Sequence, residues 1–314
     1  MTTYIITGAT SMIGIKLCQY LSKDSTNIIY AITRRNTNEL LELSKSSQIT
    51  VLHADLSNID IISNHITQAD IFIHLAWAGT DHKGRNNINI QNDNIKYSLK
   101  AVDVAAQLRC KLFVEAGSQA EYGIVNETIT ADTPCNPINE YGKAKLKFGE
   151  LASKKCIEYG IKFLHLRILS IFGETDHPWT LIMSSIKKML NNEDLELSEC
   201  KQLWNFVSID DAVKQIYLLC EYALKTNNFK SEVYLIGSHD TRKLRSFIDE
   251  MYHLTKSKSR MHFGKYTPTE IVSLDPDMSK TEKATNGFLS DYTFGEVITN
   301  IINNYKQGIY DKNI

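Results

Sequence analysis

Short apolar runs alternate with longer amphipathic stretches through the first half of this 314-residue chain. The runs are rich in Ile, Val and Phe and are apolar on successive residues, as expected of parallel strands covered on both faces. Strands are predicted at 4–7, 28–32, 49–52, 71–75, 111–116 and 162–167, and helices at 12–21, 38–44, 88–108 and 140–159. This repeated alternation predicts an α/β fold with a doubly wound parallel sheet, whose ligands bind beyond the carboxyl ends of the strands.

The alternation breaks down after Arg167. Helices are predicted at 180–190, 210–225, 242–254 and 294–305, a strand at 232–236, and an irregular polar region at 191–205. We therefore expect residues 1–170 to form a Rossmann-like domain, with 205–240 packing back onto it. Residues 171–204 and 241–314 are expected to form a smaller, discontinuous C-terminal lobe that binds the substrate.

The charge, the cysteine pattern and the apolar runs of the chain narrow the expected partners and the expected cellular compartment. The chain has 35 basic and 36 acidic residues, so no overall charge favours a nucleic acid or an anionic membrane. Its six cysteines occur singly, without a CxxC pair, which favours reduced thiols in a cytoplasmic protein over a metal site or disulfides. No apolar run approaches the ~20 residues of a membrane span, and only Met1–Thr3 precedes the first strand, so we expect no signal peptide.

A glycine-rich turn follows the first predicted strand directly. Gly8 suits a tight turn, and Gly14 suits a close contact between helix and strand, so that a pyrophosphate can lie at the positive helix N-terminus. Ser11 stands where the usual spacing has a middle glycine, and its hydroxyl could bond a phosphate oxygen. The predicted contacts are Gly8, Thr10, Ser11, Met12, Ile13 and Gly14. The alternative is a plain β–α turn without a ligand.

The end of the second strand indicates which dinucleotide binds. An NAD site normally places Asp or Glu here to accept hydrogen bonds from the ribose hydroxyls. In this chain Thr33 takes that position, and the guanidinium groups of Arg34 and Arg35 that follow suit a 2′-phosphate. The motif favours NADP(H), with NAD(H) as the second choice and a solvated basic turn as the reading without a ligand.

Two further strand ends are expected to border the dinucleotide. The predicted contacts are Asp55 and Leu56 after the third strand, and Leu75, Ala76 and Trp77 at the end of the fourth. His74 lies within the fourth strand, where a histidine with its hydrogen bonds satisfied in the core is favoured over a catalytic one.

The strongest chemical signal is a tyrosine and a lysine four residues apart, Tyr141 and Lys145, preceded by Ser118 at the end of the fifth strand. Such a pair lies on one helix face, about 5–6 Å apart at Cβ. The pKa of a free tyrosine is about 10, and a neighbouring ammonium, aided by the positive charge of an oxidised nicotinamide, is expected to lower it. Ser118 would hydrogen-bond the reacting oxygen. A helix carrying this spacing by chance is the alternative, but the order of glycine turn, serine and YxxxK favours catalysis.

With these motifs the chain resembles an extended short-chain dehydrogenase/reductase of the NAD-dependent epimerase/dehydratase family, over essentially its whole length. Segments 116–123 and 206–211 and Asn94 carry the resemblance further. It implies an NAD(P)-dependent oxidoreductase acting on nucleotide sugars, with Ser118, Tyr141 and Lys145 as catalytic residues. Asn94, Tyr141, Lys145 and Ile168 are then expected beside the cofactor.

The resemblance also narrows the reaction. Family 4,6-dehydratases carry an Asp-Glu pair after the active-site Ser or Thr, where this chain has Gln119 and Ala120, so dehydration is not expected. Glu121 is shifted by one position and, in an extended segment, would point the other way. We expect NADPH-dependent reduction of the 4-keto group of a nucleotide-activated 6-deoxy sugar, with Tyr141 as proton donor. The alternatives are a nucleotide-sugar 4-epimerase with retained NAD, a reductase of a non-sugar carbonyl, and a non-catalytic NADP(H)-binding regulator.

Signals for the substrate are thinner. The expected substrate contacts are Trp77, Ser118, Ser170, Trp204 and Arg242. Relatives often carry Arg-Asp where this chain has Trp204-Asn205, so Lys201 or Arg242 would have to replace a diphosphate-binding guanidinium. The loop 81–85 is expected to border the substrate, and relatives are often dimers through the helices that correspond to 88–108 and 140–159. We therefore expect a homodimer.

Overall fold

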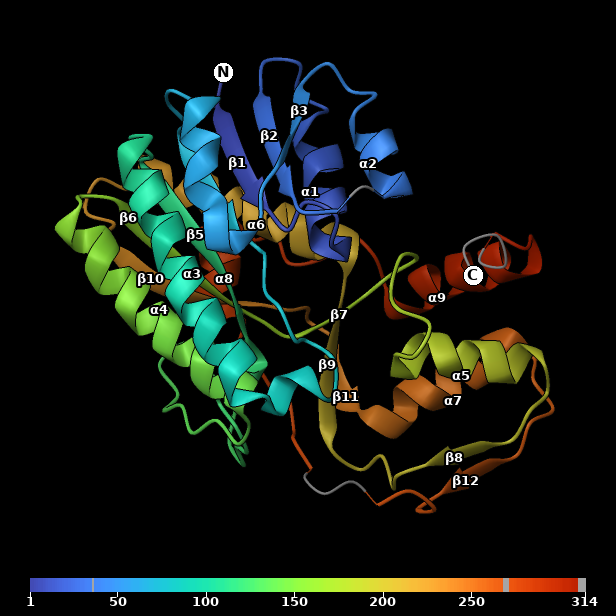
Figure 1. Cartoon of the computed structure of the whole chain (residues 1–314). Coiled ribbons are helices and arrows are strands. Elements are labelled where there is room, and N and C mark those ends of the chain that lie inside the picture. The colour runs from blue at the N-terminus through green and yellow to red at the C-terminus, as the bar shows by residue number, and fades with distance from the viewer. Residues whose placement is uncertain (36, 268–270, 310–314) are drawn as a thin grey trace.

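The computed structural model describes residues 1–35, 37–267 and 271–309. Within these residues the main sheet has seven strands, all paired in parallel. They are β1 (Thr3–Thr7), β2 (Ile28–Thr33), β3 (Ile49–His53), β4 (Ile71–His74), β5 (Leu112–Ser118), β6 (Lys162–Ile168) and β10 (Ser231–Ile236). Their order in space is β10-β6-β5-β4-β1-β2-β3, which confirms the predicted doubly wound parallel sheet (Figure 1). The strand order reverses between β1 and β4, where such sheets open a crevice for ligands.

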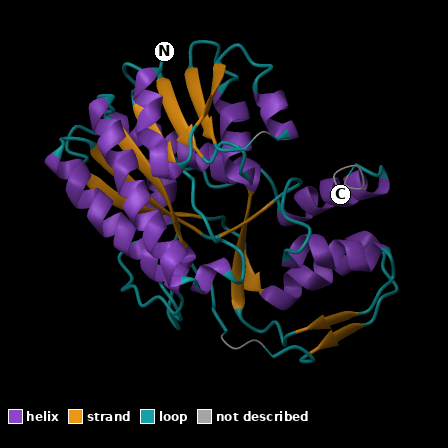
Figure 2. Ribbon diagram, viewed as in Figure 1, coloured by secondary structure: helices purple, strands orange, loops and turns teal. Residues whose placement is uncertain are grey.

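Helices cover both faces of this sheet (Figure 2). One layer contains α1 (Met12–Leu21), α2 (Asn38–Leu43) and α6 (Ile209–Lys225), and the other contains α3 (Ile88–Gln107), α4 (Glu140–Glu158) and the 3₁₀ segment η1 (Leu56–Asn64). Each layer buries its own apolar cluster against the strands. Helices α1, α3 and α4 begin where the side chains of Ser11, Asn87 and Asn139 accept hydrogen bonds from backbone N–H groups of the first turn.

A third apolar cluster lies beside the carboxyl ends of the strands. It packs α5 (Leu181–Leu190), α7 (Leu244–Thr255) and α9 (Phe294–Lys306) against β7 (Ser170–Phe172), β8 (Leu195–Leu197) and β9 (Leu203–Ser208). Phe206 is central to it, with Phe247 edge-on at 5.0 Å and Phe294 at 5.6 Å between ring centres. β11 (Thr241–Lys243) pairs with β9, and β12 (Met261–Phe263) pairs with β8. The remaining elements pack on the main sheet and its helices: α8 (Ser279–Ala284) on α6 and β10, and the short 3₁₀ turns η2 (Gly84–Asn86) and η3 (Gln119–Glu121) on α4.

The structure departs from the predicted elements at sites of non-local pairing. The segment predicted as irregular contains β8 and the start of β9, because β8 pairs with the distant β12 and β9 pairs with β7 and β11. Arg242, predicted to open a helix, lies in β11, and the helix begins at Leu244. The segment after Ser118 forms η3 instead of continuing as a strand.

Two further findings concern membrane spans and cysteines in the part of the chain that the structure describes. None of their helices is both long and apolar enough to cross a membrane. The six cysteines carry free thiols, and all but Cys135 are buried.

The packing of α1 on the first turn generates a test. A Cβ at Gly14 would lie 2.3 Å from the Gly8 carbonyl oxygen, so Gly14→Ala must displace helix or strand. We expect the free energy of unfolding to fall by about 1–3 kcal/mol, measured by chemical denaturation. Lys16→Ala, on the same helix, removes only the surface ion pair with Asp210 and should cost less than about 1 kcal/mol. Equal losses in both variants would contradict this packing.

Candidate active site

The turn between β1 and α1 fits a pyrophosphate by its shape. Gly8 adopts a positive φ of 68°, and a Cβ there would lie 2.9 Å from the Ala76 nitrogen. The Ser11 hydroxyl accepts a hydrogen bond from the Gly14 N–H at 3.1 Å, so it caps α1 beside the positive end of the helix. A tight turn that begins at Gly8 and leads into a ten-residue helix fits a dinucleotide diphosphate at the helix N-terminus.

The predicted pyrophosphate residues cluster at this turn. Thr10 approaches Thr33 of β2, with 3.4 Å between the hydroxyl oxygens, and Met12 and Ile13 are the first residues of α1. The turn is thereby tied to the end of β2, where the choice between dinucleotides is expected to be made.

The end of β2 carries two exposed guanidinium groups. The buried Thr33 hydroxyl accepts a hydrogen bond from the Arg35 N–H at 3.2 Å and fixes the backbone from which both arginines extend. Arg34 lies 3.6 Å from the carboxylate of Asp55, which directly precedes Leu56. The Ser57 N–H, together with Arg34, lowers the pKa of Asp55, so this carboxylate is charged and partly offsets the Arg34 charge.

His74 is satisfied in the core, as the sequence indicated. Its Nδ1 lies 3.0 Å from the Thr7 hydroxyl and its Nε2 lies 2.8 Å from the Ser98 hydroxyl. Burial, with a contribution from the Lys145 ammonium, lowers the pKa of His74 to about 3, so the ring is neutral.

The residues after β4 are held by hydrogen bonds from two neighbouring elements. The N–H groups of Leu75 and Ala76 donate to the Thr7 hydroxyl at 3.2 and 3.3 Å. Asn94, buried on α3, accepts from the Ala78 N–H and donates to its carbonyl, both at 2.9 Å. These bonds give Asn94 a positioning role for the loop.

Ser118, Tyr141 and Lys145 converge from two elements. Ser118 ends β5, while Tyr141 and Lys145 lie in the first two turns of α4. The buried Lys145 ammonium donates to the Ala116 carbonyl at 2.7 Å and lies 3.7 Å from the centre of a Trp77 ring. Burial lowers the pKa of Lys145 to about 8, although the carboxylates of Glu115 and Glu121 act to raise it.

The surroundings of Tyr141 differ from the expectation. Its ring is edge-on to Trp77 at 6.4 Å, and the cation against it is the Arg85 guanidinium, 4.5 Å from the ring centre. Burial raises the pKa of the Tyr141 phenol, while Arg85 and the Ser118 side chain act to lower it. The expected lowering of the Tyr141 pKa is therefore wrong for the groups of this chain. The phenol therefore keeps its proton at neutral pH, and its raised pKa makes it a weaker acid than a free tyrosine.

A cavity of about 330 Å³ opens beside Ser118. Its lining includes Arg85, Ser118, Gln119, Ser170, Asp176, Trp204 and Phe206. Three of the five predicted substrate residues, Ser118, Ser170 and Trp204, thus share one cavity. The Trp204 Nε1 atom is itself buried and has no hydrogen-bond partner within the described residues.

The proposed replacements for the missing guanidinium have acidic partners of their own. Arg242 pairs with Asp240 at 3.0 Å and with Glu250, and it packs over the Phe247 ring at 4.0 Å. Its charge is thus compensated, and it is not among the residues that line the cavity. Lys201 is exposed and pairs with Glu199 at 2.9 Å. By contrast, Arg85 lies on the cavity wall.

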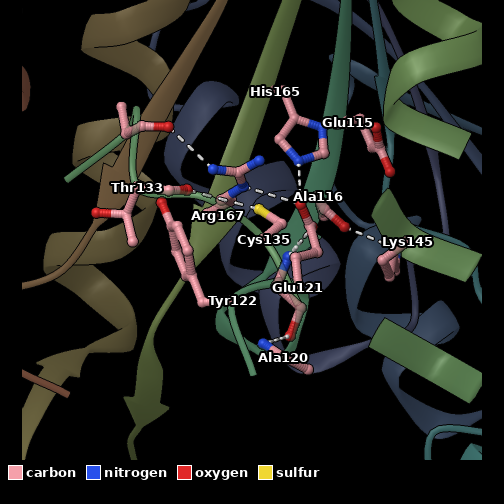
Figure 3. A network of polar contacts seen from close by, with 12 residues as sticks. Glu115, Ala116, Ala120, Glu121, Tyr122, Thr133, Cys135, Lys145, His165 and Arg167 are labelled. Atoms are coloured by element: carbon pink, nitrogen blue, oxygen red, sulfur yellow. Dashed lines mark hydrogen bonds and ion pairs between the residues drawn. The ribbon is translucent and has the colours of Figure 1, made fainter. Parts of the chain in front are cut away.

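Sequence reasoning missed a cluster of buried charges behind Ser118 (Figure 3). Its members are Glu115 of β5, Glu121 of η3, and His165 and Arg167 of β6. Glu121 does not project from an extended segment, as was expected, because η3 turns its side chain into the interior. Charged residues inside strands that are otherwise apolar would have signalled the cluster, since buried charges need partners.

Comparison with known proteins gives this geometry a family. The NAD dependent epimerase/dehydratase family model matches residues 4–237. A CDP-abequose synthase of Salmonella muenchen is 26% identical over 91% of this chain and 90% of its own length. A dTDP-6-deoxy-L-talose 4-dehydrogenase (NAD(+)) of Aggregatibacter actinomycetemcomitans is 27% identical over 68% of this chain and 77% of its own length.

A solved structure shares the fold throughout. The UDP-glucuronic acid 4-epimerase of Bacillus cereus, as a tyrosine-to-phenylalanine mutant in complex with NAD and a fluorinated UDP-sugar, matches with a TM-score of 0.86 and 20% identity. The match covers 97% of this chain and 99% of that one. The chain therefore belongs to the NAD-dependent epimerase/dehydratase family and is an oxidoreductase-type enzyme of the short-chain dehydrogenase/reductase group.

Proposed function

We propose that this enzyme modifies a nucleotide sugar and, specifically, that it uses NADPH to reduce the 4-keto group of a nucleotide-activated 6-deoxy sugar. The observation that carries the proposal is the half-buried Tyr141 phenol beside Ser118, a residue that lines the cavity. The phenol is protonated at neutral pH, which is the form that donates to the developing alkoxide, and Arg85 and the Ser118 side chain act against the rise in its pKa that burial causes. The similarity to a dTDP-6-deoxy-L-talose 4-dehydrogenase agrees with chemistry at C4 of a 6-deoxy sugar, and the similarity to a CDP-abequose synthase agrees with a nucleotide-linked substrate.

In this mechanism Ser118, Tyr141 and Lys145 each have a separate role. Ser118 hydrogen-bonds the carbonyl oxygen, and Tyr141 transfers its proton to that oxygen as the bond order falls. Lys145, charged below pH about 8, stabilises the phenolate that remains. A bound nicotinamide supplies the hydride. Apolar walls such as Phe206 and Leu169 exclude water from the reacting carbon.

The choice of NADP(H) rests on the end of β2. Thr33 offers no carboxylate to a ribose, and Arg34 and Arg35 are exposed beside the turn that would hold the pyrophosphate. Asp55 pairs with Arg34, and a 2′-phosphate would have to compete with that carboxylate. NAD(H) is the second choice, in keeping with the family and with the NAD in the Bacillus cereus structure.

We assign the remaining residues as the sequence suggested. Residues 1–170, with 205–240, would bind the cofactor, and 171–204 with 241–314 would form the substrate lobe. Ser170 and Trp204 would contact the sugar nucleotide from the cavity wall. A homodimer through α3 and α4 would cover exposed apolar side chains on these helices and at their ends, such as Ile88, Ile157 and Tyr159.

A 4-epimerase with retained NAD is the second candidate. It is favoured by the fold shared with the UDP-glucuronic acid 4-epimerase and by the acidic partner of Arg34. An epimerase recycles its cofactor within one turnover, so the two candidates differ in whether coenzyme is consumed.

The first test incubates the protein with a panel of nucleotide-linked 4-keto-6-deoxy sugars and follows the loss of NADPH absorbance. We expect consumption with at least one substrate and a loss of at least 100-fold in kcat for Tyr141→Phe, because a positioned general acid contributes about 10²–10⁴-fold. Tyr159→Phe, at the other end of α4, should keep full activity. Isomer formation without coenzyme consumption would indicate the epimerase instead.

The second test concerns the coenzyme. Arg34→Ala and Arg35→Ala should each raise the KM for NADPH by about tenfold or more and leave the KM for NADH within about twofold, since a hydrogen bond to a charged group contributes about 1.5–3 kcal/mol. The KM for NADH thus serves as the internal control. An unchanged KM for NADPH in both variants would overturn the preference for NADP(H).

The third test is a pH profile. Because kcat/KM reports the free enzyme, it should be constant below pH about 7 and fall by about tenfold per pH unit above pH about 8, as Lys145 loses its proton. Glu115 and Glu121 face this ammonium and act to raise its pKa, so Glu115→Gln should move the falling limb to lower pH. A profile that stays flat to pH 10 would contradict the role of Lys145.

A further inference from the structure

The buried charges behind Ser118 form a connected network within the sheet. Glu115 and Glu121 are 0% exposed, and His165 and Arg167 are 4% and 7% exposed. Glu115 and His165 are register partners on β5 and β6, so their contact follows from strand pairing. Burying two carboxylates in an apolar sheet is costly unless cations compensate them, which makes such a cluster unusual for a purely structural core.

His165 lies between the two carboxylates. Its Nδ1 is 2.8 Å from Glu115 Oε2, and its Nε2 is 2.8 Å from Glu121 Oε2. Arg167 Nε donates to the same Glu121 oxygen at 2.9 Å. Burial would lower the pKa of His165, but the two carboxylates raise it to about 10, so the ring carries both protons and donates in both directions.

The network reaches the catalytic segment through the second oxygen of Glu121. Glu121 Oε1 accepts the backbone N–H of Ser118 at 2.7 Å, and the Ser118 hydroxyl accepts from the Ala120 N–H at 3.2 Å. Two residues earlier, the Ala116 carbonyl accepts from Lys145 at 2.7 Å. The stretch that carries Ser118 is therefore fixed by Glu121 on one side and by Lys145 on the other. Figure 3 shows Lys145 directed at the Ala116 carbonyl.

Two glycines leave the space that the imidazole occupies. A Cβ at Gly117 would lie 2.6 Å from His165 Nε2 and 2.7 Å from Glu121 Oε1. A Cβ at Gly149 of α4 would lie 2.6 Å from His165 Cε1. Any other residue at either position would displace the ring, so the backbone on both sides is shaped around this one side chain.

We propose that Glu121, held by His165 and Arg167, is a positioning residue that fixes the Ser118 hydroxyl relative to Tyr141 and Lys145. This inference rests on the proposed function, in which Ser118 binds the reacting oxygen. Glu121 acts through the Ser118 backbone and does not touch the substrate. Its loss therefore affects the chemical step more than binding.

The test variant is Glu121→Gln, which keeps the shape but places an amide N–H₂ against donors. We expect kcat to fall by at least tenfold, with the KM for the keto sugar and the Kd for NADPH within about twofold of wild type. The matched control is Asp70→Asn at the opposite end of the sheet, where a carboxylate likewise accepts a backbone N–H, from Thr3 at 2.9 Å, and binds a lysine. Its kcat should be unchanged.

A second measurement is independent of activity. In Glu121→Gln the Ser118 amide should exchange its hydrogen at least tenfold faster than in wild type, and in Asp70→Asn at the wild-type rate. If Glu121→Gln does not fold, Gly149→Ala, which displaces His165 without touching Ser118, should lower kcat in the same way.

The outcomes separate the two proposals. Wild type that turns over no keto sugar, with faster Ser118 exchange in Glu121→Gln, would refute the proposed function and support the positioning of Ser118. An active wild type with unchanged kcat in Glu121→Gln, or unchanged kcat in Gly149→Ala if that variant is needed, would overturn the inference. An equal loss of kcat in Asp70→Asn would also overturn it, because the effect would then be one of general stability.

Discussion

Parallel pairing is the constraint on which this molecule depends. Because the seven strands of the main sheet run in one direction, their carboxyl ends lie along one edge of the sheet. The strand order reverses between β1 and β4, and ligands of such sheets bind at this edge near that point. The turn after β1, the arginines after β2, Trp77 after β4 and Ser118 at the end of β5 are thereby gathered from more than a hundred residues of chain. Helix α4 then starts beside Ser118, so Tyr141 and Lys145 lie at the same site. The packing of α4 against the end of β5 brings them there.

Desolvation governs the chemistry at that edge. It raises the pKa of the Tyr141 phenol, and it lowers the pKa of Lys145 to about 8, so the charge of this ammonium changes close to neutral pH. The same burial requires that the carboxylates of Glu115 and Glu121 be matched by His165 and Arg167. The hydrogen bonds that compensate these charges also hold the backbone of Ser118, so the same side chains balance the buried charge and fix the position of this serine.

Elements that depend on residues close together in the chain could be predicted from the sequence. Helix α1 matches its predicted bounds because Ser11 caps it and Gly14 permits its approach to the strand, and the strands of the sheet follow from apolar runs. Contacts between distant segments could not be predicted. The three residues of β8 are strand only through the pairing with β12, and η3 forms because Ser118 and Glu121 cap each other while His165 and Arg167 lie on another strand. The raised Tyr141 pKa likewise depends on burial among side chains from several elements, and Arg85 reaches the ring from the loop after β4.

The most direct test of Tyr141, Ser118 and Lys145 as a carbonyl-reducing site is to follow the hydride itself. NADPH deuterated at either face of nicotinamide C4 is supplied with a keto sugar that the enzyme consumes, and the product is examined by NMR and mass spectrometry. We predict one deuterium at sugar C4 for each NADPH oxidised, from one face only. A product without deuterium at C4, or an isomerised sugar with the label retained in the coenzyme, would contradict reduction at this site.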